Sequence, residues 1–274
     1  MQINMIRSDK VYQEMLELPL EKREGCFRAK ILAPFATKYQ TQHIPLKAKY
    51  SGGFDALFLL GFMNQLPSTL SEKDRPAIDA LSSDQLWQDC QDTIKRSIGL
   101  FEQAGYDLEV EDYHFTILLG NPEKPMLQLN KGYSGDGGIP GYLMLSLLPN
   151  DYTLPRVQAA LAHECNHNVR FQFVKWNQQT TLADWVVSEG LAESFAAELY
   201  GKDLIGPWVT STSPEQLKEI KPIISSQLQL TGMAEMAPYL YGDEIAKIQG
   251  QIPVGMPYAA GYAYGYHLIQ AYLK

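Results

Sequence analysis

The stretch LPRVQAALAHECNHNVRFQFV, residues 154–174, carries the pattern His-Glu-x-x-His at His163, Glu164 and His167. Residues four apart on an α-helix lie one above the other on the same face, so both imidazoles can be presented to one metal ion. Glu164 leans toward the same side and can reach a water on the metal, where it would act as a general base. These residue types, in this order, predict a hydrolytic metal site on a helix.

The residues around the motif favour a buried helix. Thr153 and Pro155 suit a helix start, and neither glycine nor proline interrupts residues 156–174. The side opposite the motif is apolar and carries Leu161, Ala162, Cys165 and Val169. We therefore expect a buried element with a site built into it. The alternative is a coincidence of spacing, because two core histidines and a capping glutamate give the same short pattern.

A second helix, TLADWVVSEGLAESFAAELYG at residues 181–201, carries two further acidic side chains. Thr181 and Asp184 form a capping pair at its start, and Gly201 ends it. Glu189 and Glu193 are four apart, so they share one face of this helix. That face therefore presents two carboxylates at neighbouring positions.

Those two carboxylates complete the predicted metal site. A catalytic zinc site uses three protein ligands and leaves one position open for water. Carboxylates on a small, apolar helix face are costly to bury without a cation or a metal. We expect Glu189 to be the third ligand and Glu193 to orient an imidazole through its far N–H, with Gly190 letting the two helices approach closely. The alternative, a solvated face, is disfavoured by the neighbours Trp185, Val186, Val187, Leu191 and Phe195.

Taken together, these motifs resemble a known family. HECNH and WVVSEGLAE resemble the gluzincin pattern, in which a glutamate just before a glycine on the helix after His-Glu-x-x-His completes the zinc site. More closely, AHECNH, SEGLAESFA and GYAYGYHLIQAYL resemble the bacterial YjaZ-like family of predicted Zn-dependent proteases, a domain family named for its unknown function. The resemblance covers roughly the last two thirds of the chain, from about residue 86. It implies zinc ligands at His163, His167 and Glu189 and a general base at Glu164, but no particular substrate.

The last segment, YAAGYAYGYHLIQAYLK, repeats two residue types at a spacing of four, namely Tyr258, Tyr262 and Tyr266, and Gly261 and Gly265. Glycines at this spacing let a helix pack closely on a partner. In peptide-cleaving zincins, a Tyr or His from a later element stabilises the oxyanion that develops opposite the zinc. We expect Tyr262 to be this donor, with Tyr266 as the second choice and His267 as the third. The alternative is that these tyrosines pack in the core with their hydroxyls at the surface.

The composition excludes some classes of function. Of the 274 residues, 45% are hydrophobic and 20% charged, which suits a globular protein with a sizeable core. The net charge of -8 and the pI near 5.2 argue against a nucleic-acid partner, and no dense Lys/Arg cluster offsets them. The three cysteines, Cys26, Cys90 and Cys165, are widely spaced, which suits a reducing compartment. We expect Cys165 to point away from the metal as a core residue.

No segment of the sequence predicts export or membrane insertion. Residues 1–15 carry charges and no apolar run, unlike a secretory signal. The most apolar stretch, residues 54–63, is too short to span a bilayer. We expect a cytoplasmic protein with no membrane partner, and the sequence leaves its oligomeric state open.

The first hundred residues read as mainly helical, with helix candidates at residues 8–18, 20–38, 53–65 and 83–104. Residues 67–76, PSTLSEKDRP, are polar and bounded by prolines, which is typical of a linker. We therefore expect an N-terminal helical region at residues 1–75 and a zincin-like catalytic domain at residues 76–274. The two can pack as one body.

Strands are predicted between these helices and the metal-binding helix, at residues 108–110, 113–119, 126–129 and 142–148. The glycine-rich residues 131–141 are expected to be a hairpin or a loop at the rim of the site, because they lack the Gly-Lys-Ser/Thr ending of a phosphate loop. The strand at residues 142–148 is expected to edge the cleft and to pair with an extended peptide. The predicted class is α+β: a zincin-like fold, mainly helical, with a small mixed or antiparallel sheet before the metal-binding helix.

These features predict a zinc-dependent, gluzincin-like peptidase that acts on a peptide or an unfolded protein, with Zn²⁺ as its cofactor. Two alternatives stay open. The first is a catalytically silent binding or chaperone-like module that keeps the metal for structure. The second is a zinc hydrolase of a non-peptide amide or ester, which would use the same residues.

Overall fold

The computed structural model describes residues 1–50 and 52–274. They form two compact units, Met1–Gln172 and Phe173–Lys274. The division of the chain that the sequence predicts after residue 75 stays a prediction.

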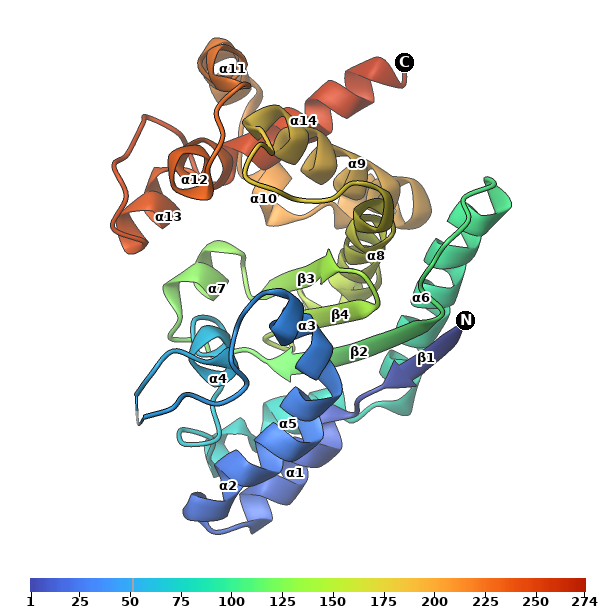
Figure 1. Cartoon of the computed structure of the whole chain (residues 1–274), viewed down its shortest axis with the longest axis vertical. Coiled ribbons are helices and arrows are strands. Elements are labelled where there is room, and N and C mark those ends of the chain that lie inside the picture. The colour runs from blue at the N-terminus through green and yellow to red at the C-terminus, as the bar shows by residue number, and fades with distance from the viewer. Residues whose placement is uncertain (51) are drawn as a thin grey trace. The chain divides into compact units, whose positions relative to one another are not determined.

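A mixed four-stranded sheet lies at the centre of the first unit (Figure 1). The described strands follow the order β1-β2-β4-β3, in which β1 and β4 pair with β2 in parallel and β3 pairs with β4 antiparallel. They are β1 (Gln2–Met5), β2 (Asp112–Leu119), β3 (Tyr133–Ile139) and β4 (Tyr142–Leu147). The predicted α+β class with a small mixed sheet is confirmed.

Both faces of this sheet are covered. Phe115 of β2 lies opposite Leu143 of β4 on one face, while Thr116 lies opposite Met144 on the other, and all four side chains are buried. Successive side chains on a strand point to opposite faces, so a strand buried on both sides reads as a continuous apolar run. Strand β4 is close to such a run, whereas β2 carries His114 and Thr116 between apolar residues. The period near two in this part of the sequence is what predicts both strands.

The position of β4 within the sheet differs from the prediction. We expected residues 142–148 to edge a cleft, but β2 and β3 pair with β4 on its two sides, so that expectation is wrong. The outer strand is β3, which comes from the glycine-rich residues 131–141 and forms a hairpin with β4. Within the described residues β3 pairs on one side only, so its other edge is a free edge of the sheet, as is the outer edge of β1 (Figure 1).

Helices surround this sheet. In α6, the buried side chains of Trp87, Cys90, Ile94 and Ile98 recur every three or four residues, which is the spacing of one helix face. No helix among the residues described has the length and apolar composition that crossing a bilayer requires. Single turns of π or 3-10 helix lie at Arg28–Leu32, Ala33–Phe35, Glu72–Asp74 and Leu154–Arg156. The α-helices are α1 (Ser8–Glu17), α2 (Leu20–Phe27), α3 (Ala36–Thr41), α4 (Ala56–Leu60), α5 (Arg75–Leu81), α6 (Asp84–Gln103), α7 (Pro125–Leu129) and α8 (Val157–Phe173).

Three short segments were predicted wrongly. Residues 126–129 form α7 rather than a strand, because Pro125 fixes φ in the first turn of a helix. Residues 108–110 are irregular, and the Val110 amide donates to the Gln172 side chain at 3.1 Å. The strand β1 was not predicted, since it is only four residues long and its pairing with β2 is distant in sequence.

The second unit is helical. Its core consists of Leu182, Val186, Ile220, Ile224, Met236, Leu240, Met256, Ala260 and Tyr264. A 3-10 turn lies at Lys202–Leu204. The α-helices are α9 (Leu182–Tyr200), α10 (Pro207–Thr210), α11 (Pro214–Gln227), α12 (Met233–Tyr241), α13 (Asp243–Ile248) and α14 (Ala260–Tyr272).

Glycines set the packing of α14. A Cβ added at Gly265 would overlap the Val186 carbonyl of α9, and one added at Gly261 would lie 2.8 Å from the Leu240 Cα of α12. The close helix packing predicted for these two glycines is therefore confirmed. Gly190 of α9 faces the Gly265 backbone, so it allows α14 to approach. The expectation that Gly190 brings α9 close to the metal-binding helix is wrong.

Candidate metal centre

The helix α8 that carries His-Glu-x-x-His is buried almost all the way round. Residues 157–169 are buried except Gln158, and the exposed fractions of His163, Glu164 and His167 are 3%, 7% and 7%. The opposite side of the helix packs in the core, as predicted. Cys165 is fully buried there, and burial raises the pKa of its thiol. Ionisable groups on so apolar an element need partners inside the protein.

The two histidines of α8 meet at their Nε2 atoms. The Nε2 atoms of His163 and His167 are 3.0 Å apart. The ring of His167 also stacks on Phe171, one turn further on, with 5.6 Å between centroids and 2° between planes. The stacking holds the orientation of the His167 ring. The four-residue spacing thus brings both Nε2 atoms to the same side of the helix, as the sequence predicts.

The third predicted ligand comes from α9. The Thr181 hydroxyl and the Asp184 carboxylate form the predicted capping box at the start of α9, and Gly201, with φ of 95°, ends the helix. Glu189 lies near the middle of this helix, and its side chain is 4% exposed. A carboxylate this buried is expensive unless it serves as an acceptor or a ligand.

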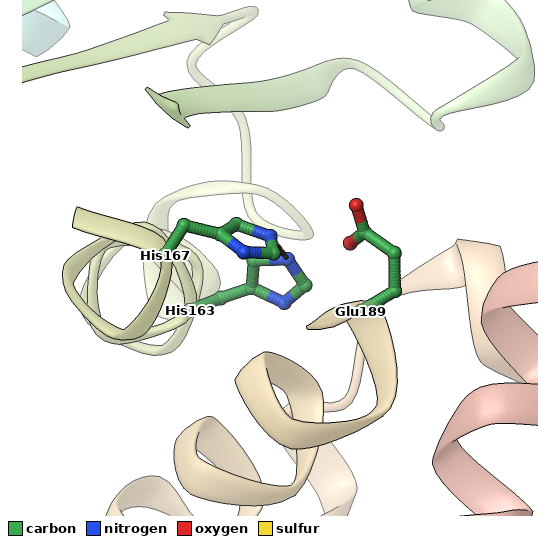
Figure 2. Close-up of side chains that lie close together, drawn as sticks. All are labelled: His163, His167 and Glu189. Atoms are coloured by element: carbon green, nitrogen blue, oxygen red, sulfur yellow. Dashed lines mark hydrogen bonds between the residues drawn. The ribbon is translucent and has the colours of Figure 1, made fainter. Parts of the chain in front are cut away.

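The structure brings the three predicted ligands together (Figure 2). His163, His167 and Glu189 each offer one ligand atom, and these atoms all lie within 4.8 Å of one another. Two imidazole nitrogens and one carboxylate oxygen are a donor set that catalytic zinc uses, with a fourth position open for water. The residues present therefore fit a zinc ion.

Glu164 of α8 lies against the edge strand β3. A Cβ added at Gly135 would overlap the Glu164 carboxylate, and one added at Gly137 would overlap its main-chain carbonyl. Both positions admit only glycine as β3 is placed, because any side chain there would displace the strand or the carboxylate. The glycine-rich sequence thus lets the sheet edge lie directly on the predicted base.

The comparison with protein families assigns the chain. Residues 86–274 match the family described as "Predicted Zn-dependent protease (DUF2268)". The chain belongs to this family. The match includes α8 and α9 and therefore every residue of the candidate metal centre. The family is described as zinc-dependent, which agrees with the buried His-His-Glu group.

Two relatives of this family member come from Bacillus subtilis (strain 168). The uncharacterized protein YjfC is 34% identical over 275 residues, which covers 100% of this chain and 91% of YjfC. The uncharacterized protein YjaZ is 28% identical over 134 residues, which covers 47% of each chain. No solved structure matches the chain.

One residue of the matched region, Asn168, was not predicted from the sequence. It follows His167 directly, is fully buried, and binds the hairpin that joins β3 to β4. Its Oδ1 accepts from the Gly141 amide at 2.8 Å. Its Nδ2 donates to three main-chain carbonyls at 2.8 to 3.0 Å, those of Gly137, Ile139 and Tyr142. Asn168 therefore fixes the hairpin on the metal-binding helix.

We expect Asn168→Asp to lower the free energy of unfolding by about 3 kcal/mol, because the change removes the donor and turns a carboxylate toward carbonyl oxygens. Urea denaturation of the metal-free protein measures this loss. Gln158→Glu is the matched control, since it makes the same chemical change on the same helix at a half-buried position. Equal losses in the two variants would contradict the role given to Asn168.

The Glu193 carboxylate accepts two hydrogen bonds from residues that follow α9 in the chain. Its Oε1 accepts from the Gly206 amide at 2.6 Å and its Oε2 accepts from the Trp208 indole N–H at 2.7 Å. These bonds tie α9 to the start of α10. They explain why this carboxylate can be buried, at 2% exposure. The role expected for Glu193, orientation of an imidazole, stays a prediction.

The three candidate oxyanion donors lie in different surroundings on α14. Tyr262 packs on Tyr241 of α12, with 6.0 Å between ring centroids. Burial, followed by the charge of Glu189, raises the pKa of Tyr241, and a hydrogen bond with Tyr262 lowers it in part. Tyr262 therefore contacts Tyr241, whose pKa responds to the charge of the predicted ligand Glu189. No local sequence signal marks Tyr241 for this position.

The other two candidates have different neighbours. Burial, and then the charge of Glu193, raises the pKa of Tyr266, which is 6% exposed. His267 is exposed and its ring packs edge-on against Tyr266, with 5.4 Å between centroids. The choice of Tyr262 as the donor stays a prediction.

Proposed function

We propose that this protein is a zinc-dependent peptidase with a zincin-like, gluzincin-type catalytic domain. The observation that carries the proposal is the buried group of His163, His167 and Glu189, with Glu164 on the same helix as the two histidines. Membership in a family of predicted Zn-dependent proteases supports the same reaction class.

In the proposed reaction, His163, His167 and Glu189 hold the ion and Glu164 moves the proton. A bound Zn²⁺ would polarise the substrate carbonyl and make a water molecule more acidic. The Glu164 carboxylate accepts the proton that this water gives up as it attacks the carbonyl carbon. Glu164 then donates the same proton to the nitrogen of the leaving amine, so the base is regenerated. The Tyr262 hydroxyl donates a hydrogen bond to the oxyanion that develops.

The free edge of β3 supports a peptide as the substrate. An extended peptide can add to such an edge through main-chain hydrogen bonds, which need no particular side chain. Gly135 and Gly137 place this strand directly against Glu164. A peptide bound along β3 would therefore run past the proposed base.

We propose that the physiological partner is a peptide or an unfolded protein rather than a nucleic acid or a membrane. The net charge of -8 supports this choice, because it opposes binding to a phosphate backbone. For the location we propose the cytoplasm. All three cysteines are free, which suits a reducing compartment.

Digestion of a peptide library tests the proposed function. We expect the zinc-loaded protein to generate new termini in a random peptide library and in a reduced, unfolded protein, as read by mass spectrometry. Removal of the metal with a chelator should abolish cleavage, and added zinc should restore it. A zinc-loaded protein that leaves every peptide bond intact would contradict the proposal. Hydrolysis of ester or non-peptide amide substrates alone would reassign it to another class of hydrolase.

A further inference from the structure

A buried lysine of α3 reaches the outer strand of the sheet. The side chain of Lys38 is 2% exposed, and its Nζ lies 2.7 Å from Oδ2 of Asp136 in β3. The same ammonium donates to Oε1 of Gln42 at 3.1 Å and lies 5.4 Å from the centre of the Tyr39 ring. An ammonium that has lost nearly all its water needs such partners, and the only carboxylate that the described residues pair with it is Asp136.

Asp136 lies in the middle of the part of β3 that packs on Glu164. It lies between Gly135 and Gly137, the two residues that press on Glu164. Because side chains alternate along a strand, Asp136 points to the opposite face, toward α3. Its cross-strand partner is Met144, and the Tyr39 hydroxyl of α3 lies 3.9 Å from the Met144 sulfur. The α3 segment therefore covers one face of the hairpin while Glu164 lies on the other.

The charge of Asp136 agrees with this pairing. Desolvation raises the pKa of its carboxyl, but the Lys38 ammonium and the Gly138 amide outweigh that effect and hold the pKa below its usual range. The strand thus carries a carboxylate on the face away from the base. The Lys38 ammonium holds that carboxylate on α3.

We propose that Lys38 is a positioning residue for Glu164, because its ion pair with Asp136 holds β3 on the catalytic base from the opposite face. Asn168 fixes the hairpin from the side of α8, so the strand is held from both faces. Lys38 precedes the residues 86–274 that match the family, so the N-terminal region contributes to the site. The catalytic consequence rests on the proposed function, but the effect on the strand does not.

Hydrogen exchange on Lys38→Met and Asp136→Asn tests the proposal. We expect amide protection in β3 and its partners in β4 to fall by at least about tenfold in each variant, with protection elsewhere in the first unit unchanged and zinc content retained. Where the wild type cleaves peptides, kcat should fall by about tenfold or more, because small displacements of a base are costly. The loss of protection in the double variant should be smaller than the sum of the two single losses, since all three variants break the same pair.

Lys30→Met is the matched control. Lys30 forms an ion pair with Glu14 in the same region, but the Lys30 side chain is 49% exposed where that of Lys38 is 2% exposed, so its loss should leave the hairpin unchanged. Unchanged protection of β3 in Lys38→Met, or a loss spread evenly over the first unit, would overturn the positioning role. This readout needs no turnover, so it distinguishes failure of the inference from failure of the proposed function.

Discussion

Glu164→Gln is expected to lower kcat by about a hundred- to ten-thousandfold while the protein keeps about one zinc ion per chain. Glutamine has the size of glutamate, so α8 and the strand β3 keep their packing around position 164. It cannot accept a proton from water at neutral pH, so the proton that Glu164 is proposed to move has no acceptor. Single-turnover assays on a cleaved peptide, together with elemental analysis, measure both quantities.

Glu198→Gln is the control for this change, because it makes the same replacement at an exposed position of α9. It should leave kcat within about twofold of the wild type. If Glu164→Gln retained turnover with its zinc in place, Glu164 would not be the base. Loss of zinc from the same variant would instead make Glu164 part of the metal-binding group.

Elemental analysis of the purified protein is expected to find about one zinc ion per chain, and His163→Ala and Glu189→Ala are each expected to lose it. The three ligand atoms lie within 4.8 Å of one another, so removal of any one leaves an incomplete donor set. Free zinc at about a thousandfold over its dissociation constant should stabilise the wild type by about 4 kcal/mol. Chelation should therefore lower the melting temperature of the wild type and leave that of both variants unchanged.

Glu198→Ala is the matched control on the same helix as Glu189, and it should keep the metal. Zinc lost from all three variants alike would indicate general destabilisation rather than a missing ligand. A wild type that stays free of metal after zinc is supplied would reduce the motif of α8 to a coincidence of spacing. The proposed peptidase would then have no catalytic centre.

The sequence predicts the metal ligands because their signals are local. His163 and His167 are one helical turn apart, and the capping pair and terminal glycine of α9 fix where that helix begins and ends. Helix period alone then puts Glu189 and Glu193 on one face. Strands β2 and β4 are predictable for a similar reason, since the period near two of their apolar residues is also a local signal.

The contacts that surround those ligands are not local, and the sequence does not predict them. Asn168 gives no sign in its own neighbourhood that it binds a hairpin. Lys38 and Asp136 meet only because α3 packs across β3 and β4. The edge position of β3 depends on strand order, which periodicity does not encode, and that is why we placed β4 at the edge instead. Tyr241 likewise meets Tyr262 only through the packing of α12 on α14.

The glycine content of β3 also bears on self-association. A strand with a free edge is a template for pairing with a second copy of the chain, and proteins with such edges risk aggregation. Glycine has a low preference for strands, and Asp136 places a charge in the middle of this one. The edge is therefore a poor template for pairing with a second copy of the chain. It stays accessible to the peptide substrate proposed above without favouring aggregation.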